Sequence, residues 1–137
     1  MASALYNSYK QNMIDNDLGI DLDDDALRAA LVDITAGYTY VATHTFRTNL
    51  TNVTADGSTA GNFTAVSVTD GVFDAGDLTY PSVAGPNGVG AIVIYRNVGT
   101  AATDDLIAYI DGFTEVIANG GDITVTWDAG ANRIFAL

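Results

Sequence analysis

The sequence predicts a mainly β protein, an antiparallel β-sandwich or jelly-roll-like domain that is preceded by a short N-terminal helix or arm. From Tyr38 onward, β-branched and aromatic residues dominate and are interrupted by Gly, Asn and Asp. The apolar runs 91–95 and 106–110 have the length of single strands. Asp70-Gly71, between two apolar segments, is typical of a tight hairpin turn. Short strands separated by turns indicate a sandwich or a barrel.

The N-terminal segment carries the one clear helical pattern, over residues 4–14, with Ser3 as a possible N-cap. Apolar residues recur there at helical spacing: Leu5, Tyr6, Tyr9 and Met13. A helix of about 11 residues is unstable in water on its own, so it either packs on its own domain or acts as an arm that binds a partner. We therefore divide the chain into residues 1–22, the helix or arm with an acidic turn, and residues 23–137, a single β-rich domain.

The acidic turn at residues 15–25 holds six of the sixteen aspartates. An EF-hand calcium loop counted from Asp21 needs Gly at its sixth position and Glu at its twelfth, where this chain has Ala26 and Val32. The EF-hand interpretation therefore fails. We predict a solvated acidic turn and no metal site.

Residues 25–34 fit two structures. Leu27, Ala30, Leu31 and Ile34 lie on one face of a helix, whereas Leu27, Ala29 and Leu31 also alternate as in a strand. Propensity alone favours the helix.

The rest of the chain predicts strands. They fall at residues 63–69, 72–73, 78–80, 90–96, 106–111, 116–118, 123–127 and 133–137. The Asn119–Asp122 turn is expected to close a second hairpin, and residues 49–62 to form a surface loop. The expected core includes Phe73, Ile92, Ile94, Ile107, Val125, Trp127 and Phe135.

The runs 91–95 and 106–110 are apolar at every position, so both faces of each strand must be covered. This is expected of central strands, or of strands whose second face meets another chain. Both interpretations stay open at this point.

Composition excludes several classes of function. With 137 residues, 48% hydrophobic, the chain has the size of one folded domain. It has no Cys and one His, so Cys/His zinc sites, haem attachment, iron–sulfur clusters and thiol catalysis are excluded. The formal charge of −12 has the wrong sign for binding phosphates, and we expect no nucleic-acid partner.

The sequence also predicts no membrane partner. The longest purely apolar run is five residues, whereas a membrane-spanning helix needs about 20. The first fourteen residues lack the basic start and apolar stretch of a secretory signal.

Candidate catalytic groups are few, and we predict no enzyme, no catalytic residue and no cofactor. His44 is the only histidine, and therefore the only imidazole that could act as a base for Ser58, Ser67 or Ser82. None of these serines lies in a nucleophile-elbow motif. The aspartates Asp70, Asp74 and Asp77 are close in sequence but sit where turns are expected, and Glu115 is the only glutamate. The Gly-rich segment 85–90 precedes a strand, so it lacks the helix N-terminus of a phosphate-binding loop.

Several segments together resemble a family of small structural proteins of tailed bacteriophages. They are TDGVFDA (69–75), AIVIY (91–95), LIAYID (106–111), NGGDITVTWD (119–128) and NRIFAL (132–137), with ALY (4–6) and LVD (31–33) in the first half. The resemblance spans most of the chain and is strongest over residues 69–137. In that family, residues 27–32 are more strand-like than here.

The resemblance implies a virion component, most plausibly a capsid cement or decoration protein that binds the outside of the head and stabilises it. It implies the major capsid protein as partner, assembly into small oligomers, and a location on the capsid exterior after assembly in the host cytoplasm. We expect a homotrimer before a dimer, because the two doubly apolar strands and the N-terminal helix offer more hydrophobic surface than one small domain easily hides, and an icosahedral shell presents three-fold and two-fold positions. The alternative is a receptor- or glycan-binding module of a tail or head fibre. Such a module would expose aromatic side chains on loop tips, for which the candidates are Tyr38, Tyr40, Phe63 and Phe113.

Overall fold

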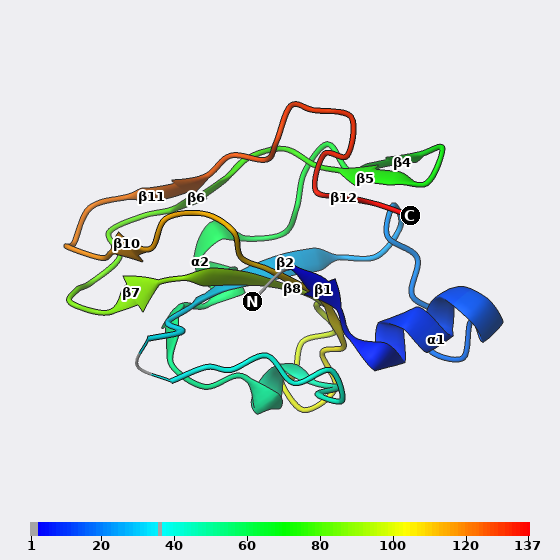
Figure 1. Cartoon of the computed structure of the whole chain (residues 1–137). Coiled ribbons are helices and arrows are strands. Elements are labelled where there is room, and N and C mark those ends of the chain that lie inside the picture. The colour runs from blue at the N-terminus through cyan, green and yellow to red at the C-terminus, as the bar shows by residue number, and fades with distance from the viewer. Residues whose placement is uncertain (1–2, 36) are drawn as a thin grey trace.

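The computed structural model describes residues 3–35 and 37–137, and shows a mainly β protein with several antiparallel sheets and a short N-terminal helix (Figure 1). Met1 and Ala2 of the segment 1–22 lie outside the described residues. The helices are α1 (Asn7–Asp15), the 3-10 turn η1 (Arg47–Asn49) and α2 (Gly57–Ala60). The strands are β1 (Ala4–Leu5), β2 (Leu27–Val32), β3 (Val53–Ala55), β4 (Ser67–Thr69), β5 (Val72–Asp74), β6 (Leu78–Tyr80), β7 (Gly88–Val89), β8 (Ala91–Arg96), β9 (Leu106–Ile110), β10 (Val116–Ile117), β11 (Ile123–Val125) and β12 (Phe135–Ala136).

The largest sheet has five antiparallel strands in the order β1-β9-β8-β2-β3. Three smaller antiparallel sheets pair β11 with β6, β12 with β5 and β4, and β10 with β7. In Figure 1 the sheets β11-β6 and β12-β5-β4 lie on one side of the five-stranded sheet, and the segment that runs from β2 to η1 lies on the other side. The five-stranded sheet is therefore covered on both faces.

Each face of the five-stranded sheet has its own hydrophobic core. Toward the small sheets, Leu31, Ile94 and Ile107 pack with Phe73 and Tyr80. On the opposite face the core consists mainly of tyrosines and small aliphatic residues: Tyr6, Ala30, Val32, Tyr38, Leu50, Ala91, Val93, Tyr95, Leu106 and Tyr109. The apolar strands β8 and β9 are thus internal strands, buried on both faces within this chain. No second chain is needed to cover them.

The helix favoured by propensity for residues 25–34 is wrong, because residues 27–32 form β2. All six residues of β2 pair in register with β8, and this pairing outweighs the helix propensity of Ala29 and Ala30. Two further contacts hold β2 in place. The Tyr80 hydroxyl donates to the Ala29 carbonyl at 2.5 Å, and Gly57 of α2 approaches so closely that a side chain there would collide with Arg28 and Tyr95.

The surface loop predicted at residues 49–62 is also only partly correct. Its middle part is β3, which forms an edge of the five-stranded sheet beside β2, and it is followed by the short helix α2. The Asp56 carboxylate accepts a hydrogen bond from the Ser58 N–H at 2.8 Å and caps α2. Pattern reasoning missed these elements because each is only three or four residues long.

The N-terminal helix exists but begins later than predicted, at Asn7 instead of residue 4. Ala4 and Leu5 are extended and pair with β9, and Ser3 bonds the Asp111 backbone instead of capping a helix. Tyr6 is fully buried. Among the described residues, this segment therefore packs on its own domain and does not project as an arm.

Of the two predicted hairpins, one is confirmed and one is wrong. Asp70 and Gly71 adopt the positive φ values of 52° and 77° and join the paired strands β4 and β5. The Asn119–Asp122 turn instead connects two different sheets, since β10 pairs with β7 and β11 pairs with β6.

The strands predicted at 72–73, 78–80, 90–96 and 106–111 correspond to β5, β6, β8 and β9. Those predicted at 63–69, 116–118, 123–127 and 133–137 are shorter, as β4, β10, β11 and β12. Five of the seven predicted core residues are buried, whereas Trp127 and Phe135 are only partly buried. The four shortened strands, β4, β10, β11 and β12, therefore cover less of the chain than the apolar patterns that predicted them.

Replacing Trp127 by alanine is expected to lower the free energy of unfolding by about 2 kcal/mol, less than the roughly 3–5 kcal/mol for a fully buried aromatic residue. The indole ring is half-buried beside Phe63, and its Nε1–H donates to the Gly76 carbonyl at 3.1 Å. Urea unfolding followed by circular dichroism measures the loss. A loss below about 1 kcal/mol would contradict the packing described here.

Candidate functional site

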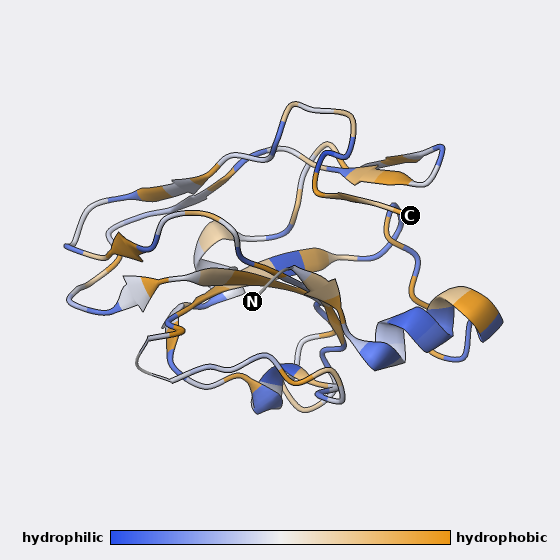
Figure 2. Ribbon diagram, viewed as in Figure 1, coloured by the Kyte–Doolittle hydropathy of each residue, from blue (hydrophilic) through white to orange (hydrophobic). Residues whose placement is uncertain are grey.

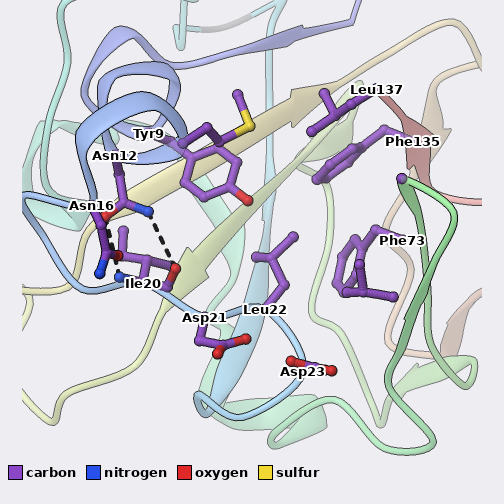
Figure 3. A pocket seen from close by; sticks show the side chains of 13 residues that line it. Tyr9, Asn12, Asn16, Ile20, Asp21, Leu22, Asp23, Phe73, Phe135 and Leu137 are labelled. Atoms are coloured by element: carbon purple, nitrogen blue, oxygen red, sulfur yellow. Dashed lines mark hydrogen bonds between the residues drawn. The ribbon is translucent and has the colours of Figure 1, made fainter.

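An open groove lies between α1, residues 20–23 and the sheet β12-β5-β4 (Figure 3). Its volume is about 490 Å³. The buried residues Tyr9, Ile20, Leu22 and Phe73 form its apolar floor. Its rim carries more exposed apolar side chains, Met13, Val68 and Leu137. Leu137 is 70% exposed although it is fully apolar.

Asn12 fixes one wall of this groove. It lies on the buried face of α1, where its Oδ1 accepts hydrogen bonds from the N–H groups of Leu18 and Ile20 at 3.2 Å. Its Nδ2 donates to the Ile20 carbonyl, also at 3.2 Å. The turn after α1 starts at Asn16, which adopts the left-handed conformation. The Asn12 side chain supplies hydrogen-bond partners for backbone groups of Leu18 and Ile20 in this turn. The acidic turn is thus held against the helix.

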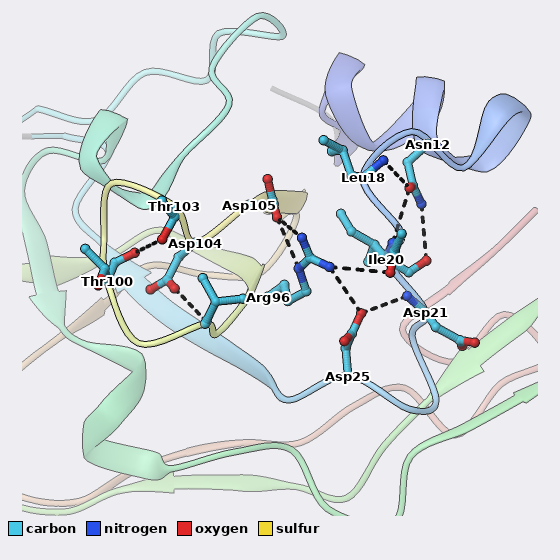
Figure 4. Close-up of polar contacts among 12 residues, drawn as sticks. Asn12, Leu18, Ile20, Asp21, Asp25, Arg96, Thr100, Thr103, Asp104 and Asp105 are labelled. Atoms are coloured by element: carbon cyan, nitrogen blue, oxygen red, sulfur yellow. Dashed lines mark hydrogen bonds and ion pairs between the residues drawn. The ribbon is translucent and has the colours of Figure 1, made fainter.

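A second anchor of the acidic turn is Arg96, at the end of β8 (Figure 4). Its guanidinium bonds the buried Asp105 carboxylate through two nitrogens, at 2.5 and 3.1 Å. It also reaches Asp25 at 3.7 Å and the Gly19 carbonyl at 3.4 Å. The start and the end of the acidic turn are therefore tied to the five-stranded sheet.

The groove rim is strongly acidic. The segment from α1 to Asp25 holds six aspartates and one basic residue, Lys10. Asp21 and Asp23 line the groove, and a hydrogen bond and charge repulsion from Asp23 raise the pKa of Asp21. Burial, with the nearby Asp21 charge, raises the pKa of Tyr9 in the floor to about 12. The carboxylates of the rim thus contribute to both shifts.

A second exposed apolar surface surrounds β10. We call the exposed apolar side chains on and beside β10 the β10 patch: Ile34, Phe113, Val116 and Ile117, which are 38–57% exposed, with the consecutive Val116 and Ile117 on opposite faces of the strand. Beside it, a cavity of about 340 Å³ is lined by Phe113 and Val116 together with Thr and aliphatic residues of neighbouring strands. Figure 2 colours both β10 and the end of α1 as hydrophobic, and the two lie on opposite sides of the molecule.

The candidate catalytic residues are not brought together. Among the described residues, the structure pairs His44 Nδ1 with the Tyr38 hydroxyl, at 3.2 Å, and not with any of the three serines. Ser58 lies in α2, Ser67 lies in β4, and Ser82 follows β6. The Tyr38 hydroxyl also bonds the buried Tyr6 hydroxyl at 2.7 Å. His44 thus belongs to the tyrosine-rich core.

The remaining candidate carboxylates have ordinary structural positions. Asp70 occupies a turn, Asp74 lies 3.8 Å from Arg133, and the Glu115 carboxylate accepts from the Thr35 hydroxyl. Over residues 3–35 and 37–137, no group of three or more His, Asp or Glu side chains is arranged to hold a metal ion. In the same residues no helix is long and apolar enough to cross a membrane.

The aromatic residues expected on exposed loop tips are mostly not exposed. Tyr38 and Phe63 are buried, and the partly buried Tyr40 donates its hydroxyl to the Leu5 carbonyl at 2.9 Å. Phe113 alone of these four is an exposed large hydrophobic residue.

Sequence reasoning missed the groove. It is formed by segments from both ends of the chain and from β4 and β5, and no local pattern brings them together. One signal was present: Asn12 lies on the same helix face as Tyr9, where a buried amide must find partners. The ion pairs of Arg47 and Arg96 gave no sequence signal, because their partners lie nine or more residues away and share no helix or strand with them.

Comparison with known protein families finds no matching family model, and comparison with curated proteins finds no significant sequence match.

Raising the pH above about 10 is expected to destabilise the protein steeply. Burial raises the pKa values of Tyr9 and Tyr95 to about 12, and those of Tyr6 and Tyr80 also rise. Near neutral pH every tyrosine is protonated in both states. Above about pH 10 the unfolded chain loses these protons while the folded protein keeps them, so the free energy of unfolding falls by up to about 1.4 kcal/mol per pH unit for each tyrosine.

The measurement is urea unfolding at several pH values, with Tyr9→Phe as a matched variant. This variant should have a smaller alkaline loss than the wild type and nearly unchanged stability at neutral pH. An identical pH profile for the two proteins would show that Tyr9 does not contribute.

Proposed function

We propose that this chain is a structural virion protein of a tailed phage, a capsid cement or decoration protein that binds the major capsid protein on the outside of the head. The observation that carries the proposal is the position of the two exposed apolar surfaces, the groove and the β10 patch, on opposite sides of one small domain. A cement must contact two neighbours at once, and the double core gives it a stiff body between those contacts. The sequence resemblance points to the same role.

We also infer that the fold is a β-sandwich. The five-stranded sheet would be one layer, and the sheets β11-β6 and β12-β5-β4 would be the second layer, with the larger core between them. Short strands in the second layer support this arrangement over a regular jelly roll.

The proposed homotrimer, or dimer, does not form through β8 and β9, because both strands are already covered within the chain. We propose that the copies contact one another through the β10 patch. Its exposed side chains are apolar, so burying them against a second copy would remove apolar surface from water, and the neighbouring Glu115 carboxylate accepts from the Thr35 hydroxyl. A trimer could repeat the same contact around a three-fold axis of an icosahedral shell.

The test uses the full chain and undecorated capsids. We expect the protein to sediment with capsids and to raise the temperature at which the shells burst. Ile117→Asp should reduce the wild-type oligomer to monomers in sedimentation velocity, whereas Val98→Asp, at an exposed position outside both surfaces, should not. A protein that never binds capsids would refute the cement role.

The alternative, a receptor- or glycan-binding module, has less support, because Tyr38 and Phe63, two of its four candidate aromatic residues, are buried. A low copy number per virion, instead of hundreds, would favour that alternative.

A further inference from the structure

The groove combines an apolar surface with an acidic rim. Its floor and rim are apolar, from Tyr9 and Phe73 to the exposed Leu137. Along one side of this apolar surface run Asp21 and Asp23, with further aspartates in the same turn. Figure 3 shows these two carboxylates on the groove side facing Phe73 and Leu22. The groove is therefore amphipathic.

The negative charge of the turn is not balanced locally. Arg96 contacts the turn, but it is already bonded to Asp105 as well as Asp25. Arg133, on the far side of the groove, lies beside Asp74. Lys10 is the chain's only lysine. A hydrogen bond with Asp23, together with charge repulsion from it, raises the pKa of Asp21, as expected of two carboxylates held close together.

The size of the groove suits side chains of a polypeptide. Its volume of about 490 Å³ lies within the usual range of about 300–1,000 Å³ for ligand pockets. It is bounded by fixed elements, because Asn12 and Arg96 hold the acidic turn and β12 pairs with β5. A partner would find this surface largely preformed, which reduces the entropic cost of binding.

We propose that this groove binds a short basic, amphipathic polypeptide segment of a different protein. Its apolar side chains would occupy the floor, and its Lys or Arg side chains would pair with Asp21 and Asp23. This inference deepens the proposed function and rests on it, in that the segment would belong to the capsid shell.

Charge also argues against other occupants. A second copy of this chain offers few basic groups to Asp21 and Asp23, because it has only five basic residues and three of them, Arg47, Arg96 and Arg133, already lie beside aspartates. Nucleic acid and anionic lipid surfaces carry the same sign as the rim and would be repelled. A basic segment is the occupant whose binding relieves the repulsion at the rim.

The test uses the full-length protein and a fluorescein-labelled amphipathic peptide of about 14 residues, made of leucines at positions i, i+3, i+4 and i+7 with lysines between them. Fluorescence anisotropy measures the Kd. We expect saturable binding that weakens as salt is raised. The same peptide with glutamates in place of the lysines should bind at least about tenfold more weakly.

Two pairs of variants locate the binding. Asp21→Asn/Asp23→Asn removes the two groove carboxylates and should weaken binding about fivefold, while Asp77→Asn/Asp128→Asn removes two exposed carboxylates outside the groove and should not. Leu137→Ala should weaken binding because Leu137 lines the groove, and Val98→Ala should not because Val98 lies outside it. Both side chains are more than half exposed, so neither substitution threatens the fold.

Equal Kd values for all four variants would place the peptide elsewhere and overturn the inference. Equal binding of the lysine and glutamate peptides would overturn it as well. A self-association of the wild type that Leu137→Ala abolishes would assign the groove to a second copy. If capsids bind the wild type and Asp21→Asn/Asp23→Asn equally, the groove inference fails and the cement role stands. If the peptide binds as expected but capsids do not, the cement role fails and the groove stands.

Discussion

Deleting residues 1–14 is expected to unfold the protein, and not to leave a folded β domain behind. The deletion removes β1, which forms one edge of the five-stranded sheet. It also removes Tyr6 and Tyr9, which are 0% and 4% exposed and contribute to the two cores. Losing each buried aromatic side chain costs about 3–5 kcal/mol, so the two together approach the whole stability of a typical domain, about 5–15 kcal/mol.

This expectation reverses the one that follows from treating the segment as an arm for capsid binding. An arm that packs on a partner would contribute little to its own domain, and its removal would weaken binding alone. Here the Tyr6 ring lies 5.1 Å from the ring of Tyr40, and its hydroxyl bonds Tyr38. The N-terminal segment thus holds the layer between β2 and η1 against the sheet.

Circular dichroism and urea unfolding of the truncated chain measure the effect. Tyr6→Phe is the matched control, because it keeps the ring and loses only the hydrogen bond, with an expected cost of about 1–2 kcal/mol. Met13→Ala, on the exposed side of α1, should cost less than about 1 kcal/mol. A truncated protein that unfolds cooperatively with wild-type stability would show that the segment is dispensable for folding.

Asp104→Ala is expected to lower the free energy of unfolding by about 3–5 kcal/mol. Asp104 is 0% exposed, and its carboxylate accepts hydrogen bonds at 2.8 Å from Arg47 Nε and from the Val98 N–H. Arg47 in turn bonds Asp56 at 2.7 Å and lies 5.1 Å from the centre of the Tyr95 ring. Without Asp104, the half-buried Arg47 guanidinium keeps Asp56 but loses its buried carboxylate partner, and the Val98 N–H loses its acceptor.

The matched control is Asp77→Ala, at an exposed carboxylate that should change stability by less than about 0.5 kcal/mol. The double variant Asp104→Ala/Arg47→Met tests the mechanism, because removing both charges should recover part of the loss. If the double variant is less stable than Asp104→Ala, the loss of stability is not caused by the Arg47 guanidinium that Asp104→Ala leaves without its buried partner.

The sequence is sufficient to predict the mainly β class, the short N-terminal helix and the positions of the strongest strands. These features depend on local chemistry, such as the apolar run that became β8 and the Asp70-Gly71 turn with its positive φ values. It also determined the charge of −12 and the acidity of residues 15–25, since these follow from composition alone.

The tertiary structure makes residues 27–32 a strand and not a helix, because pairing with β8 supplies energy that local propensity does not contain. It also decided that the N-terminal segment is part of the core and that the Asn119–Asp122 turn joins two sheets. The groove belongs to the same class of feature. It depends on the approach of α1, β5 and the last residue, Leu137, and segments that far apart in the chain meet only when the whole domain packs.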